Sequence, residues 1–60
     1  PIKIQIYSMD GRLVRNETIL GNEYVWRGDN QAGQQLQPGI YICKVQSDNQ
    51  IFTGKIIMGK

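Results

Sequence analysis

Hydrophobic and polar residues alternate near the start of this 60-residue chain, and the alternation predicts a β-strand. Ile2, Ile4 and Ile6 occupy every second position, with Lys3 and Gln5 between them. In a strand this spacing places the isoleucines on one face and the polar residues on the other. No segment has the 3.6-residue spacing of an amphipathic helix. We therefore expect an all-β fold that begins with a half-buried strand.

The dipeptide Asp10-Gly11 predicts a hairpin turn after this first strand. Glycine accepts positive φ without steric cost and aspartate tolerates it, so the pair is frequent in tight turns. A second strand over about residues 12–18 should return antiparallel to the first. Leu13 and Val14 are adjacent in it, so the pattern leaves open which of the two faces the core.

Tyr24 and Trp26 occupy alternate positions in the next segment, which predicts a third strand there. Residues 28–39 then hold three glycines and a proline, and we interpret them as a loop with turns near 30–33 and at 38–39. This loop is the longest segment without a predicted strand.

Two more strands are predicted in the last third of the chain. Residues 40–45 are apolar on both faces, which indicates a central strand covered at least in part on both sides. A hairpin turn at 47–49 leads to a fifth strand over about 50–58. Gly54 lies inside that strand and suggests a bulge or a close approach of another segment.

Five short strands with turns roughly every ten residues are typical of an antiparallel β-sandwich or small barrel. A meander is the simplest topology, and a Greek-key crossing through the 28–39 loop is the alternative. Sixty residues form at most one domain, here residues 1–60.

The residue inventory argues against several functions. Seven basic and five acidic residues give a formal charge of +2, and the basic residues are scattered, so no nucleic-acid partner is predicted. The chain has no histidine and no nucleophile–base pair, so we do not expect an enzyme. Cys43, the single cysteine, cannot form an internal disulfide or by itself a thiolate metal site. We expect no cofactor and no metal, and interpret Cys43 as a small apolar residue within a strand.

Three blocks of the sequence resemble one known family. Residues 7–14, YSMDGRLV, are similar to the strand–turn–strand of type IX secretion C-terminal sorting domains. Trp26, Gly28 and Gly33, followed by PGIYICKV, resemble the middle of that family, and FTGKIIMGK resembles its closing strand. The immunoglobulin-like domain of flagellar hook-capping proteins shares the middle block, but the basic and aliphatic ending favours the sorting domain.

The resemblance implies a small immunoglobulin-like β-sandwich that lacks the family's first strand or strands. It implies a C-terminal fragment of a larger protein, in which the cargo domain lies N-terminal to Pro1. The domain would direct that cargo across the outer membrane of a Bacteroidetes-type bacterium. The implied partners are the type IX outer-membrane machinery and a sortase, for which the domain would be a substrate. The implied locations are the periplasm in transit and then the outer membrane, the cell surface or the medium.

Two sets of residues carry these expectations. The basic and aliphatic end of the last strand would be the recognised secretion signal: Lys55, Ile56, Ile57, Met58 and Lys60. The other set would be the structural motif of turn glycines and core aromatic residues: Gly11, Trp26, Gly28, Gly33, Gly39 and Tyr41.

Other readings of the sequence remain open at this point. If the first strands of the sandwich are missing, the strand at 2–6 loses its neighbour, which predicts either a strand-mediated homodimer or a structure in which the missing part is present. The chain could instead be a structural immunoglobulin-like module of a surface or hook-capping protein. Arg27-Gly28-Asp29 spells an adhesive tripeptide, but beside a core tryptophan we interpret Gly28 as a turn residue and both charges as solvated.

Overall fold

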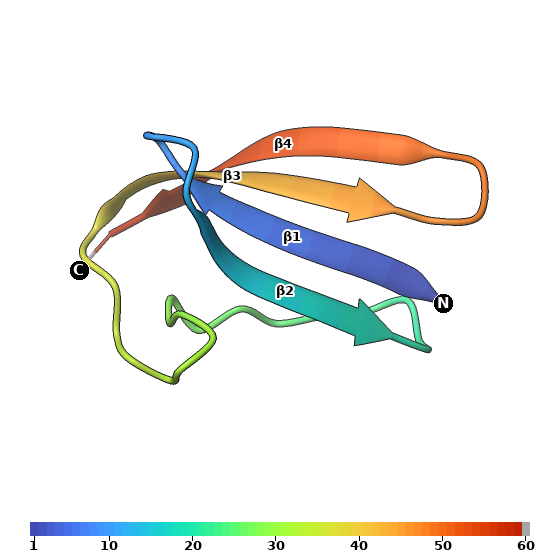
Figure 1. Ribbon diagram of the computed structural model, residues 1–60, viewed down its shortest axis with the longest axis horizontal. Coiled ribbons are helices and arrows are strands. Elements are labelled where there is room, and N and C mark those ends of the chain that lie inside the picture. Colours follow the sequence, from blue (N-terminus) through green and yellow to red (C-terminus); the bar gives the residue numbers. More distant parts are fainter. Residues whose placement is uncertain (60) are drawn as a thin grey trace.

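The computed structural model describes residues 1–59, and these residues form one four-stranded antiparallel sheet without any helix. The strands are β1 (Ile2–Ser8), β2 (Leu13–Ile19), β3 (Gly39–Gln46) and β4 (Ile51–Met58). Their order in the sheet is β2-β1-β3-β4 (Figure 1). The predicted all-β antiparallel class is confirmed, and the structure is consistent with a small immunoglobulin-like sandwich fragment.

Two hairpins and one crossing connection give this order. β1 and β2 form the first hairpin, and β3 and β4 form the second. The connection of residues 20–38 leaves β2 and crosses to β3, which pairs with β1 on the side away from β2 (Figure 1). The order therefore excludes the pure meander and agrees with a crossing through the long loop.

The first hairpin turns where Asp10-Gly11 predicts. Gly11 has φ +87°, a left-handed conformation that favours glycine. Its backbone N–H donates to the Ser8 carbonyl at 3.0 Å, and the Ser8 N–H donates to the Arg12 carbonyl at 2.9 Å. The Ser8 hydroxyl also donates to the Asp10 carboxylate, and this hydrogen bond lowers the pKa of Asp10.

The pairing of β1 with β2 explains the adjacent Leu13 and Val14. Ile6 pairs with Arg15 and Tyr7 pairs with Leu13, so Val14 is an extra residue at an irregularity in the register. Val14 packs against the core, while Leu13 remains 44% exposed. Leu13 and Val14 thus face opposite sides of the sheet. Alternation along the sequence could not say which of the two faces the core.

The core lies on one face of the sheet, which we call the inner face. Ile4, Ile6 and Tyr41 are buried there. The half-buried residues that pack against them come from all four strands and from the connection: Ile2, Val14, Ile19, Tyr24, Trp26, Leu36, Cys43, Val45, Ile56 and Met58. The 20–38 connection therefore acts as the second layer of the fold.

The third strand predicted at Tyr24 and Trp26 is wrong, because residues 23–27 form no β-pairing. The side chains still alternate as expected, since Tyr24 and Trp26 are half-buried while Val25 is 73% exposed. A strand also requires a backbone partner, and among residues 1–59 none pairs with this segment. Alternation therefore predicted correctly which side chains face the core. It did not predict whether the backbone of this segment pairs with another strand.

Two further expectations are corrected by the strand pairing. β3 and β4 pair in continuous register, and a Cβ at Gly54 would meet nothing within 4 Å, so Gly54 marks neither a bulge nor a close approach. The strand at 2–6 has not lost its neighbour, because β1 pairs with β2 on one side and β3 on the other. The free edges of the sheet belong to β2 and β4.

Tyr41→Ala should lower the free energy of unfolding by about 3–5 kcal/mol, because it removes a buried aromatic ring. Tyr41→Phe keeps the ring and loses only the hydroxyl donor, so it should cost about 0.5–1.5 kcal/mol. Urea unfolding followed by the fluorescence of Trp26, the single tryptophan, measures both. Equal losses for the two variants would contradict the packing described above.

Cys43 provides a second test of the inner face. Its side chain is half-buried opposite Ile6, and burial raises the pKa of its thiol. Because the thiolate is the reactive form, a disulfide reagent at pH 8 should modify the folded chain several-fold more slowly than the chain in urea. Equal rates would show that this part of the inner face is open to solvent.

Candidate recognition surface

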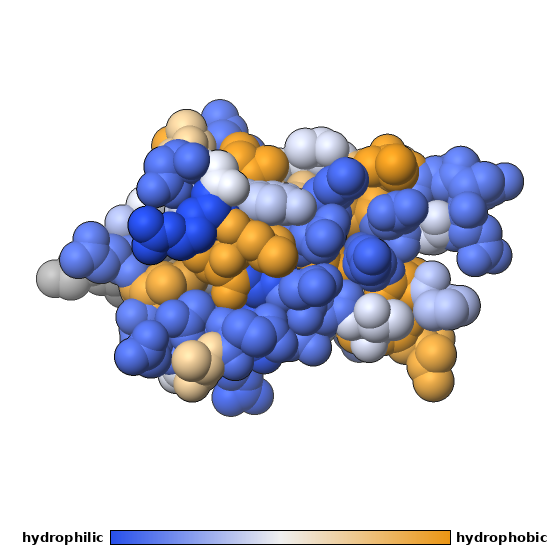
Figure 2. Space-filling model, in the orientation of Figure 1, coloured by the Kyte–Doolittle hydropathy of each residue, from blue (hydrophilic) through white to orange (hydrophobic). Residues whose placement is uncertain are grey.

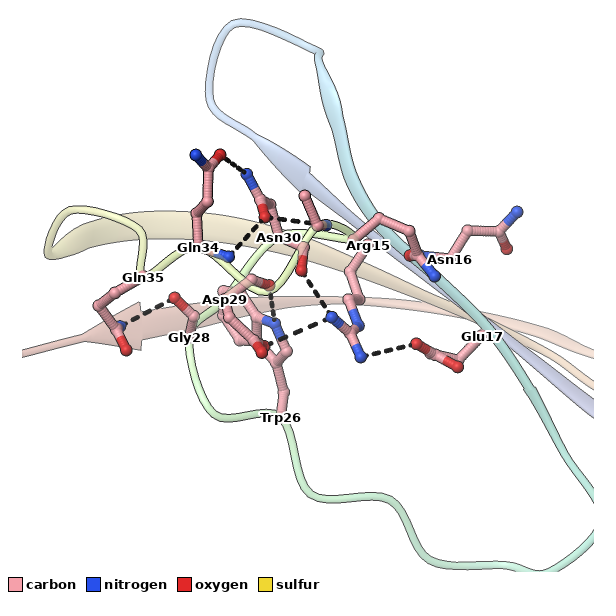
Figure 3. A network of polar contacts seen from close by, with 11 residues as sticks. Arg15, Asn16, Glu17, Trp26, Gly28, Asp29, Asn30, Gln34 and Gln35 are labelled. Atoms are coloured by element: carbon pink, nitrogen blue, oxygen red, sulfur yellow. Dashed lines mark hydrogen bonds and ion pairs between the residues drawn. The ribbon is translucent and has the colours of Figure 1, made fainter.

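Arg15 makes two polar contacts that join β2 to the connection and one with Glu17 on β2 itself (Figure 3). Its guanidinium donates from Nη1 to the Asn30 carbonyl at 2.6 Å, and pairs with Glu17 at 2.8 Å and with Asp29 at 3.6 Å. Burial alone would lower the pKa of Arg15, but Tyr24, Asp29 and Glu17 raise it above its ordinary value. The side chain therefore stays charged and holds the connection on the inner face.

Asn30 shapes the tight turn inside the connection. Its side-chain oxygen accepts from the backbone N–H groups of Ala32 at 3.0 Å and Gln34 at 2.9 Å. Its backbone carbonyl accepts from the N–H of Gly33, which has φ +85°. A residue with a short polar side chain followed by a left-handed glycine is the local reason that the chain reverses here.

Trp26 and Tyr41 pack against each other with ring centroids 5.3 Å apart and planes at 70°. The indole N–H of Trp26 donates to the Asp29 carbonyl at 2.8 Å. The hydroxyl of Tyr41 donates to the Gln37 carbonyl at 2.6 Å. Each ring is thus inserted into the apolar layer while its polar end binds the connection, which satisfies both groups.

Gly28 brings the connection against the last strand. It is buried with φ +78°, and a Cβ at this position would lie 2.5 Å from Met58 Sδ and 2.8 Å from Gln35 Nε2. The Gly28 carbonyl accepts hydrogen bonds from the Leu36 N–H and the Gln35 side chain. Trp26, Gly28, Ile56 and Met58 line a cleft of about 400 Å³ at the end of β4.

The structure distributes the predicted signal residues over both faces of β4. Ile56 and Met58 are half-buried on the inner face. Lys55 and Ile57 point to the opposite face, where Ile57 is 75% exposed. Lys60 lies outside the described residues. The four described side chains, from Lys55 to Met58, lie along one strand and its free edge instead of forming one cluster.

The glycines of the predicted structural motif lie in separate turns. Gly11 is in the first hairpin, Gly28 and Gly33 are in the connection, and Gly39 begins β3. Within the connection, Asp29 and Gln35 form an isolated β-bridge. Gly28 and Gly33 therefore shape the second layer, while Gly11 and Gly39 belong to the sheet and its first hairpin.

The Arg27-Gly28-Asp29 tripeptide is not presented at a loop tip. Gly28 is buried, and the Asp29 carboxylate pairs with Arg15. An adhesive ligand needs its acidic side chain available to the receptor, so this geometry disfavours the adhesion hypothesis. Gly28 turns the chain as predicted, whereas Asp29 is half-buried and paired with Arg15 instead of being fully solvated.

Comparison with protein families identifies the chain. A family model described as the secretion system C-terminal sorting domain matches residues 1–59. This chain belongs to that family. Searches of curated proteins and of solved structures gave no match. The chain is therefore a C-terminal sorting signal for type IX secretion cargo, and the structural-module alternative is not favoured.

Family membership places this sorting domain in a known export route. It implies interaction with the type IX secretion machinery and export across the outer membrane to the cell surface or the medium.

Within residues 1–59 no group of three or more histidine, cysteine, aspartate or glutamate side chains could hold a metal ion. No helix in the same residues is long and apolar enough to cross a membrane.

Sequence reasoning missed Arg15 and Gln35, which hold the sorting domain's connection in place. It predicted the turn near 30–33 that Asn30 shapes, because an asparagine three residues before a glycine is a common turn pattern. Arg15 has no local signal, because its partners Asp29 and Asn30 are 14 and 15 residues away in the chain. Only the folded structure brings these groups together.

Gly28→Ala should destabilise the domain more than Gly33→Ala. Both glycines have positive φ, so each alanine should cost about 1–2 kcal/mol of backbone strain. At Gly28 the methyl group also collides with Met58 and Gln35, which should add about 1–3 kcal/mol, while Gly33 has open space around it. Urea unfolding of both variants measures the difference.

Shortening Met58 provides the control for this comparison. If the collision is the cause, Met58→Ala should recover part of the stability lost in the Gly28→Ala variant. Equal destabilisation by the two glycine substitutions would contradict the close approach of Gly28 and β4.

Proposed function

We propose that the secretion machinery reads this sorting domain at β4, by adding a strand to its free edge. The observation that carries the proposal is the position of β4 as an edge strand, paired along its whole length with β3 on one side. An edge strand offers unpaired backbone N–H and C=O groups to an extended partner.

The side chains of β4 support selectivity in this mode of binding. In strand addition the backbone hydrogen bonds give affinity, and alternate side chains give specificity. Lys55 and Ile57 project to one face, while Ile56 and Met58 project toward the cleft beside Trp26. A partner strand could therefore contact a basic and aliphatic pair on one side and an apolar cleft on the other.

The proposal also covers the domain's position in its parent protein, its route and its removal. Residues 1–60 would form a single sorting domain behind a cargo domain that lies N-terminal to Pro1. It would pass through the periplasm, be read at β4 and Lys60, and be removed by a sortase without any catalytic role of its own. A second copy could also pair with the β4 edge, and such a homodimer would have to open before the edge is read.

A reporter carrying residues 1–60 at its C-terminus, expressed with a periplasmic signal in a type IX-competent bacterium, tests this proposal. Removing residues 56–60 should leave the reporter in the periplasm. Ile57→Asp should reduce surface delivery strongly, because this exposed side chain lies on β4 outside the core. Leu20→Asp is the matched control, since Leu20 is 92% exposed and lies away from β4, and it should preserve delivery.

Fractionation of the cells followed by surface protease treatment gives the readout. The fluorescence of Trp26 in the purified variants checks that the fold is retained. Normal surface delivery of the reporter without residues 56–60 would overturn the assignment of the signal to β4.

A further inference from the structure

The face of the sheet opposite the core carries basic and aliphatic side chains from three strands, among them Lys55 and Ile57 of β4. We call it the outer face. Side chains alternate along a strand, so Lys3 lies on this face because Ile4 is buried on the inner one. The strand pairing places Lys44 and Lys55 on the same face, since Lys44 pairs with Gln5 and Lys55 pairs with Ile42.

These three lysines form a diagonal row across three adjacent strands. Lys44 on β3 lies opposite Gln5, two residues from Lys3 on β1. It also lies opposite Thr53, two residues from Lys55 on β4. Diagonal neighbours of this kind are about 7–8 Å apart, close enough for their charges to repel each other. The row is therefore a concentration of positive charge on an otherwise modestly basic chain.

No carboxylate on the strands of the outer face balances this row. Glu17 is on the inner face with Arg15, Glu23 and Asp29 belong to the connection, and Asp10 and Asp48 lie in the hairpin turns. Asp48 borders one end of the row, where it lines a shallow depression with Lys3. Among residues 1–59 the ion pairs involve only Arg15, so the lysines are available to an external anion.

Exposed aliphatic side chains flank the lysine row on the same face. Ile57 is 75% exposed, Ile51 is 58% exposed and Ile40 is 39% exposed. Hydrophobic residues also reach the surface among hydrophilic ones in the space-filling view (Figure 2). Positive charge combined with exposed aliphatic groups on one face is the combination that binds the interface of an anionic membrane.

The type of basic residue favours diffuse attraction over one directional contact. Arginine is preferred where a carboxylate or phosphate is held in a fixed bidentate geometry, whereas lysine interacts as a point charge on a flexible stem. Arg15 is engaged in the inner network, and Arg12 borders the connection on the other side of the sheet. The outer face thus has charge without the directional donors that a specific carboxylate site needs.

We propose that the outer face docks the domain onto a membrane surface of anionic lipid. Lys3, Lys44 and Lys55 would lie at the headgroup phosphates, and the exposed isoleucines would lie at the boundary with the acyl chains. The backbone N–H and C=O groups at the edge of β4 would remain free, because docking uses side chains on the face of the sheet. The inference shares Lys55 and Ile57 with the proposed reading of β4, but it also rests on Lys3 of β1 and Lys44 of β3, so lipid binding can be tested apart from secretion.

Co-sedimentation of the full chain with lipid vesicles tests this inference. The chain should bind vesicles of 30% phosphatidylglycerol in phosphatidylcholine far more strongly than pure phosphatidylcholine vesicles, and added salt should weaken the binding. Lys44→Gln should reduce the partition coefficient roughly fivefold, and Lys3→Gln together with Lys44→Gln roughly 25-fold. Ile51→Ser should also weaken binding.

Arg12→Gln is the matched control, because it removes the same charge away from the outer face and should change binding little. Urea unfolding checks that each variant is folded. Equal losses for Lys44→Gln and Arg12→Gln would overturn the proposal, since net charge alone would then explain the binding. Equal binding to both kinds of vesicle, or no binding to the anionic ones, would also overturn it. Lys3 and Lys44 lie outside β4, so the effect of Lys3→Gln and Lys44→Gln on vesicle binding is independent of the reporter assay, whereas Ile51→Ser changes a β4 side chain.

Discussion

The packing of Trp26 against Tyr41 is the contact on which the rest of this fold depends. This sheet buries one face, and the cover for that face is an irregular connection that forms one isolated β-bridge and no strand. The two rings meet between the layers, and each donates a hydrogen bond back to the connection, at Asp29 and at Gln37. Ring packing and these two hydrogen bonds together hold the irregular connection against the sheet as its second layer.

The position of the secretion signal follows from this arrangement. The connection covers the inner face and reaches β4 only at its end, where Gly28 approaches Met58. The remaining length of β4 has one hydrogen-bonded neighbour, β3, and several exposed apolar side chains. Edge strands open more readily than central ones, and β4 is more exposed along its length than β2, the other edge strand, so the proposed signal is accessible to a partner.

Charge is divided between the two faces in a way that separates structural from interacting groups. On the inner face Arg15 is compensated by Glu17 and Asp29, and this network fixes the connection to β2. On the outer face the lysines have no carboxylate among the neighbouring strand residues. Arg15 therefore serves the fold, while the unpaired lysines of the outer face are free to attract an anionic surface.

The sequence by itself determined the features that depend on neighbours along the chain. Alternation assigned Ile4 and Ile6 to the core and predicted the inward facing of Tyr24 and Trp26, and Asp10-Gly11 predicted its turn, because side-chain direction and positive φ are local properties. The family blocks also indicated the sorting function. Only the tertiary structure decided the strand order, the extra residue at Val14, the missing pairing at 23–27 and the meeting of Gly28 with Met58. Each of these depends on a backbone or side-chain partner far away in the sequence, which no local pattern specifies.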